Sequence, residues 1–244
     1  MAKLNPVFSG IKVDEGIESA ATVKGVAGKT FILLIITVIS AILSINYGIS
    51  MVFDNPFILL FVGIGAIVCG ILGQVNPNAA KIASVIYSIC EGLLLGLISF
   101  VFEAEISGIV LTAILLTLTI FGVMLFLYST KIIKVTTRFV KVMTTISIAV
   151  IIMSLIYFIS YIINPNNVLI VALTNSPGLL LLVSGFILLY GAFMLLLDFE
   201  EVNVIVSNGF DKKYEWTAAL GLMVTVVWIY VQVLRLLAIF ARRD

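Results

Sequence analysis

The chain has 244 residues, of which 62% are hydrophobic and 11% are charged, with a formal net charge of +1 and no histidine. Soluble domains average roughly 45–50% apolar and about 25% charged residues, so this composition indicates an integral membrane protein. Without histidine there is no H-E-x-x-H metal site and no catalytic triad of the usual kind. Walker A and Rossmann glycine patterns are also missing from the sequence. We therefore expect no enzyme, no cofactor and no nucleic-acid partner.

In chain order, seven apolar runs each approach the ~20 residues that a helix needs to cross a bilayer. They lie near residues 27–47, 57–75, 82–102, 106–128, 142–163, 179–197 and 217–240. Barrel strands need only about 9–11 residues and alternate in polarity, so these runs favour helices. We predict an all-α membrane protein with seven transmembrane helices, one transmembrane domain over residues 1–244, and a cytoplasmic segment 1–26 without a cleavable signal peptide.

The distribution of Lys and Arg predicts the orientation, because cytoplasmic loops are enriched in these residues. With the N-terminus inside, the inner segments hold eleven of the 14 basic residues, namely Lys3, Lys12, Lys24, Lys29, Lys81, Lys131, Lys134, Arg138, Lys141, Lys212 and Lys213. The outer loops hold none, and Glu103 and Glu105 there either attract cations or are merely solvated. Arg242 and Arg243 oppose this assignment, unless the last segment re-enters and brings the C-terminus inside. Both positions of the C-terminus stay open, with N-inside and C-outside favoured.

Glu91 is the clearest candidate for a functional residue, because it lies near the centre of the third apolar run. A carboxylate at the bilayer centre costs about 2.5–3.5 kcal/mol by insertion scales unless it is neutralised, paired or hydrated. Small residues repeat beside it (Ser84, Ser88, Gly92 and Gly96), and the second run has a similar stripe of Gly63, Ala66, Gly70 and Gly73. Such stripes are typical of helix packing, which leaves Glu91 itself unexplained.

The last run carries a polar face on which residues recur at steps of four and three: Gly221, Thr225, Trp228, Gln232 and Arg235. A polar stripe of this length indicates contact with protein or water rather than lipid, so we place this helix centrally in the bundle. In the sixth run, Asp198 lies where the apolar residues end. It is either a solvated interfacial carboxylate or, if the helix continues to Asn208 and Gly209, a partly buried group two to three turns from the helix end.

Short motifs spread over nearly the whole chain carry a family resemblance. They are Asn5-Pro6-Val7-Phe8, Glu91-Gly92-Leu93 with Gly96, Leu197-Asp198-Phe199, and Tyr214-Glu215-Trp216-Thr217-Ala218-Ala219-Leu220-Gly221-Leu222 through Leu234-Arg235-Leu236-Leu237. In order and placement they resemble the transmembrane Bax inhibitor motif family, specifically its bacterial Bax-inhibitor-like branch. The resemblance implies six helices around a central last helix, a location in the bacterial cytoplasmic membrane, and a pH-sensitive calcium leak.

The resemblance also implies a pH sensor of two aspartates, on the sixth and seventh helices, near a basic group on the second. Asp198 matches the first aspartate, but Thr225 occupies the position of the second and Gln74 lies where the basic group is expected. The acidic pair of the family is therefore incomplete in this chain. Any pH response then rests on the burial of Asp198, or on Glu91 as the second acid.

These features together predict a cation leak channel that conducts calcium beside the last helix. Asp198 is the expected gate, Thr225 its hydrogen-bond partner, and Glu91 a cation or proton site, with Gln232 and Arg235 on the same pathway. Asp198 and Glu91 are the candidate transient calcium ligands, because hard cations favour oxygen donors. The alternative is a non-conducting protein that modulates membrane proteases or stress responses by packing against a membrane protein partner. The oligomeric state stays open.

Overall fold

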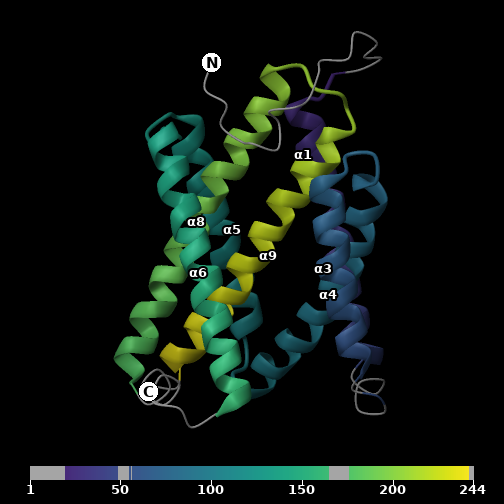
Figure 1. The fold of residues 1–244 in the computed structure, drawn as a ribbon. Helices are drawn as coiled ribbons and strands as arrows, with labels where there is room; N and C mark the ends of the chain where they lie inside the picture. The colour runs from purple at the N-terminus through teal and green to yellow at the C-terminus, as the bar shows by residue number, and fades with distance from the viewer. Residues whose placement is uncertain (1–19, 49–54, 56, 165–175, 242–244) are drawn as a thin grey trace.

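The protein is a bundle of long helices, and the computed structural model describes residues 20–48, 55, 57–164 and 176–241 (Figure 1). The helices are α1 (Val23–Leu43), α3 (Phe57–Val75), α4 (Ala80–Glu105), α5 (Ile109–Ser129), α6 (Thr137–Ile163), α8 (Pro177–Ser207) and α9 (Tyr214–Ala241), with a π-helical turn η2 (Ser44–Gly48) after α1. Seven spans are long and apolar enough to cross a membrane. This confirms the predicted all-α membrane class.

α8 is the longest helix, at 31 residues, because the chain stays helical beyond its apolar run. Pro177 lies in its first turn, where a missing backbone N–H costs nothing. The helix ends at the expected stop signal, where Asn208 caps it and Gly209 adopts a positive φ of 65°. Asp198 therefore lies nine residues, or about two and a half turns, before the last helical residue Ser207. Of the two interpretations of Asp198, the structure supports the continued helix.

The acidic residues that were expected in an outer loop belong instead to the last turn of α4, which continues to Glu105. The carboxylate of Glu103 accepts backbone hydrogen bonds from Gly108, at 2.6 Å, and from Val110, at 3.0 Å. These N–H groups lie at the start of α5, where helical partners are lacking. Glu103 thus caps the turn between α4 and α5, a structural role that the sequence did not indicate.

Consecutive helices alternate in direction, so the start of α1 and the end of α9 lie at opposite ends of the bundle (Figure 1). One end carries most of the basic residues, namely Lys24, Lys29, Lys81, Lys131, Lys134, Arg138, Lys141, Lys212 and Lys213, and is called the lysine-rich end below. α9 begins there and continues unbroken for 28 residues, about 42 Å. A helix of that length can span a membrane completely, which favours a full span over a re-entrant segment.

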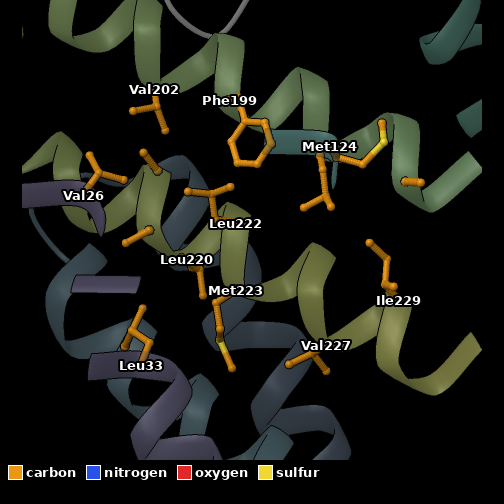
Figure 2. Packing of buried hydrophobic residues seen from close by; sticks show 14 of the residues in the cluster. Val26, Leu33, Met124, Phe199, Val202, Leu220, Leu222, Met223, Val227 and Ile229 are labelled. Carbon is orange, nitrogen blue, oxygen red and sulfur yellow. The ribbon is translucent and has the colours of Figure 1, made fainter. Parts of the chain in front are cut away.

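α9 is the most buried helix of the described chain and packs against α1, α3, α4, α5 and α8. Figure 2 shows its Leu222 below Phe199 of α8, while Val26 and Leu33 of α1 lie on another side. α6 packs mainly on α8, and none of its most apolar window is buried. The central position expected for the last helix therefore agrees with these contacts, whereas α6 lies at the periphery and does not pack closely on α9.

The small-residue stripe of α4 is a packing surface for α1. A Cβ atom at Gly92 would overlap the carbonyl oxygen of Thr37, and one at Gly96 would overlap that of Ala41. On α3, Gly73 makes room for Leu220 of α9, whose Cδ2 atom would lie 2.5 Å from an added Cβ. Close approach of backbones is the usual reason for small residues between membrane helices, and here it brings α1, α3, α4 and α9 together.

Candidate functional site

Asp198 and Thr225 meet in the contact between α8 and α9. The Thr225 hydroxyl hydrogen bonds to the Asp198 carboxylate. The second carboxylate oxygen, Oδ2, is buried and has no hydrogen-bond partner among the described residues. Glu201 lies one turn further along α8, close enough for its charge to act on Asp198. The structure thus brings together two residues that the sequence places 27 positions apart, with a carboxylate oxygen left available between the helices.

An amide from α3 reaches the same region of α9. A Cβ atom at Gly221 would lie 3.3 Å from Nε2 of Gln74, so the missing side chain at Gly221 leaves room for this amide. Gly221 precedes Thr225 by one helical turn on the same face. α3 therefore contributes a neutral hydrogen-bond donor and acceptor next to the Asp198–Thr225 contact, where the family resemblance implies a basic group.

The C-terminal part of the polar face of α9 is separate from Asp198. Gln232 follows Thr225 by seven residues, or about 10 Å along the helix. Its side chain is 6% exposed, and its Oε1 atom has no hydrogen-bond partner in the part of the chain that the structure describes. Arg235 comes one turn later and is exposed. The five predicted site residues therefore divide into the Asp198–Thr225 contact, the buried Gln232, the exposed Arg235, and Glu91.

Glu91 lies along the contact between α3 and α4. It is half-buried, and the Tyr87 hydroxyl one turn earlier hydrogen bonds to its carboxylate. The Tyr87 ring faces Gly70 of α3, and the thiol of the neighbouring Cys90 faces α3 at Gly65. Within the described ranges, no recorded interaction joins Glu91 to Asp198. The acid whose charge acts on Asp198 in this structure is Glu201, and a role for Glu91 as the second acid stays a prediction.

A buried ion pair at the lysine-rich end was not predicted as a site. Glu215, in the first turn of α9, is 1% exposed and pairs with Nζ of Lys29 on α1 at 2.5 Å. Its carboxylate also accepts from the backbone N–H of Thr22 at 2.8 Å and from the Thr22 hydroxyl at 3.2 Å. An added Cβ atom at Gly25 would overlap this carboxylate. We call Thr22, Gly25, Lys29 and Glu215 the α1–α9 latch.

Further contacts reinforce the latch. Nζ of Lys29 donates to the carbonyl of Lys212 at 3.3 Å and lies 5.2 Å from the centroid of the Trp216 ring. The backbone N–H of Ala21 donates to the carbonyl of Phe210 at 2.7 Å. The segments that precede α1 and α9 are thus joined side by side. The sequence offered one signal, an acidic residue in the first turn of a helix, but the pairing with Lys29 depends on tertiary structure.

The candidate site offers single oxygen atoms rather than a cage for a resident ion. Among the described residues, no group of three or more His, Cys, Asp or Glu side chains is placed to hold a metal. Asp198 provides a carboxylate and Thr225 a hydroxyl, both suitable for a hard cation. Calcium sites that hold their ion use six to eight oxygen ligands, more than Asp198 and Thr225 provide.

Seven helices that are long and apolar enough to cross a membrane define a multi-pass membrane protein. A family profile described as Bax inhibitor 1 like matches residues 5–242, nearly the whole chain. The chain therefore belongs to the Bax inhibitor family, as its motifs predicted, while its place in the bacterial branch stays a prediction. Comparisons with curated proteins and with solved structures returned no match.

Proposed function

We propose that this protein is a cation leak channel of the bacterial cytoplasmic membrane, that calcium is the transported ion, and that Asp198 controls its passage. The observation that supports the proposal is the Asp198 carboxylate in the α8–α9 contact, which accepts a hydrogen bond from Thr225 and has a buried oxygen without a partner among the described residues. Ionisable groups within membrane spans are costly and by default indicate ion pathways. Family membership is consistent with this role.

The same proposal assigns the orientation. Cytoplasmic loops are enriched in Lys and Arg, so the lysine-rich end faces the cytoplasm and the N-terminus is cytoplasmic. The end of α9 then faces outward. A cation that enters from outside passes Arg235 and Gln232 before it reaches Asp198, while the α1–α9 latch holds the cytoplasmic start of α9 in place.

The test is calcium influx into liposomes that contain the purified protein and an enclosed calcium dye, at acidic and at neutral pH. We expect Asp198→Asn to change influx about tenfold, which corresponds to about 1.4 kcal/mol in the barrier, and to weaken its pH dependence. Glu200→Gln is the matched control, because Glu200 lies on the same helix but accepts a hydrogen bond from Tyr128 of α5 at 2.8 Å. Glu91→Gln is expected to have the smaller effect of the two site variants.

Two results would reject the channel. One is wild-type influx no faster than that into empty vesicles. The other is influx unchanged in both Asp198→Asn and Glu91→Gln. The first would favour the alternative, a non-conducting protein that acts on a membrane partner by helix packing.

A further inference from the structure

Three buried oxygen atoms without a hydrogen-bond partner lie beside one helix, α9. Among the described residues they are Oγ1 of Thr217, Oδ2 of Asp198 and Oε1 of Gln232. Thr217 and Gln232 are 3% and 6% exposed, so neither side chain lies on the lipid-facing surface of the bundle. Buried polar groups normally have a partner, and each exception requires a physical reason. Three exceptions beside one helix therefore suggest a common cause.

The three oxygens are on one face. A helix advances about 100° per residue, so Thr225, which contacts Asp198, and Gln232 both lie within about 80° of the direction of Thr217. Eighteen residues make five turns, so Arg235 points in the same direction as Thr217, about 27 Å away. This face, from Thr217 to Arg235, thus extends along most of the helix, and we call it the open-oxygen face.

Polar groups on the other faces of α9 differ, because they have protein partners. The Tyr230 hydroxyl pairs with Ser99 of α4 at 2.7 Å, and Glu215 pairs with Lys29 of α1. Met223 and Val233, which also lie away from the open-oxygen face, are apolar and fully buried. The missing partners are therefore a property of one face rather than of the helix as a whole.

Two helices border the open-oxygen face. Gln74 of α3 approaches it at Gly221, and Gly191 of α8 lies against the Trp228 ring. The Trp228 ring also packs edge-on against Tyr190, with centroids 5.8 Å apart. α3 and α8 both pack on α9 but make no extensive contact with each other in the described part of the chain. The open-oxygen face therefore lies along a seam between two helices.

We propose that the open-oxygen face is hydrated along its length and that Oε1 of Gln232 is a second oxygen ligand for a passing cation, about 10 Å outward from Asp198. Water is the ordinary partner of buried polar atoms that lack a protein partner, and carbonyl, hydroxyl and carboxylate oxygens all suit a hard cation. Hydration of the face is independent of conduction, whereas the ligand role of Gln232 rests on the proposed function.

Hydration is tested by cysteine accessibility in full-length protein in liposomes, after Cys69→Ala and Cys90→Ala. Single cysteines replace Thr217 and Gln232. Leu220, about one turn after Thr217, and Val233, next to Gln232, serve as buried controls. A membrane-impermeant cationic methanethiosulfonate reagent should modify the cysteines of the open-oxygen face at least about tenfold faster, because a thiol in apolar surroundings is inert. Equal rates on the two faces would overturn the proposal. The chromatographic elution profile and the helix content of each purified variant identify those that fail to fold.

The ligand role is tested by calcium influx. Gln232→Met keeps the length of the side chain and removes the oxygen, so influx should fall by about threefold or more if that oxygen replaces part of the hydration shell. Leu234→Met is the matched control and should leave influx unchanged. If the wild-type protein conducts no calcium but the cysteines of the open-oxygen face react rapidly, the proposed channel function is rejected and the hydration of the face is supported. If calcium influx persists, slow modification of the cysteines on the open-oxygen face rejects its hydration, and unchanged influx in Gln232→Met rejects the ligand role of Gln232. In both cases the proposed channel function is kept.

Discussion

The α1–α9 latch should contribute a large share of the stability at the lysine-rich end, and Glu215→Gln tests this. In the native protein the Glu215 carboxylate pairs with Nζ of Lys29 at 2.5 Å and accepts two hydrogen bonds from Thr22. The glutamine has the same shape and retains one acceptor oxygen, so the substitution removes charge rather than volume. Its effect on unfolding therefore reports the ion pair and not a cavity.

The expected decrease in the free energy of unfolding depends on the contacts that Lys29 retains in Glu215→Gln. Removal of one partner of a buried ion pair costs about 3–5 kcal/mol. Lys29 is 14% exposed and retains the Lys212 carbonyl and the Trp216 ring, so the loss should be smaller, about 2–3 kcal/mol. In soluble proteins of this size a loss of about 1 kcal/mol in the free energy of unfolding lowers the thermal unfolding midpoint by about 2–4 °C. A loss of about 2–3 kcal/mol therefore corresponds to a decrease of about 4–12 °C in this midpoint.

Thermal unfolding in detergent, followed by tryptophan fluorescence and helicity, measures the decrease. A double-mutant cycle with Lys29→Met isolates the interaction between the two side chains. Lys24→Met is the control, because Lys24 lies on the same helix and is exposed. If Glu215→Gln unfolds within about 0.5 kcal/mol of the wild type, or if its effect is the same in the Lys29→Met background, the ion pair does not stabilise the contact.

Two further predictions concern stability. Gly96→Ala should destabilise the α1–α4 contact by about 1–3 kcal/mol through overpacking, because its Cβ atom would overlap a carbonyl oxygen of α1. Gly63→Ala is the control: the space around Gly63 is open, so this variant should be neutral or slightly stabilising. Equal unfolding midpoints of the two variants would contradict the packing argument. Glu103→Gln should cost about 0.5–2 kcal/mol, as the loss of a helix cap does, because the carboxylate bonds to the backbone of Gly108 and Val110; an unchanged midpoint would show that the turn does not depend on it.

Hydropathy and helical periodicity predict most of the fold, because a helix that crosses a bilayer requires a long apolar run whatever its tertiary contacts are. The polar face of α9 was also visible, since its period is local to one helix. The same local reasoning offered, as one of two interpretations, a sixth helix that continues past Asp198 to the stop signal at Asn208 and Gly209, and the structure supports it. Features that repeat within one helix can therefore be predicted from this sequence.

Features that depend on two helices were harder to predict. Glu215 was noted only as part of a motif, because nothing local shows that Lys29, 186 residues earlier, is its partner. Glu91 was the most conspicuous charge in the sequence, but its recorded partner is Tyr87 on its own helix. Glu103 was assigned to a loop because its role as a cap appears only when the backbone of α5 is in place. The presence of an acidic residue in the sequence thus did not distinguish the ion pair of Glu215, the helix cap of Glu103 and the proposed gate at Asp198.

The identity of the acid beside Asp198 changes how a gate could work. In a pair divided between α8 and α9, movement of one helix separates the two carboxylates. In this chain the nearest second acid is Glu201, three residues away on the same helix as Asp198, so helix motion leaves the two acids together. The contact that motion does break is the hydrogen bond from Thr225. A gate built in this way depends on whether Thr225 or water satisfies the Asp198 carboxylate, and the hydrated face of α9 supplies that water.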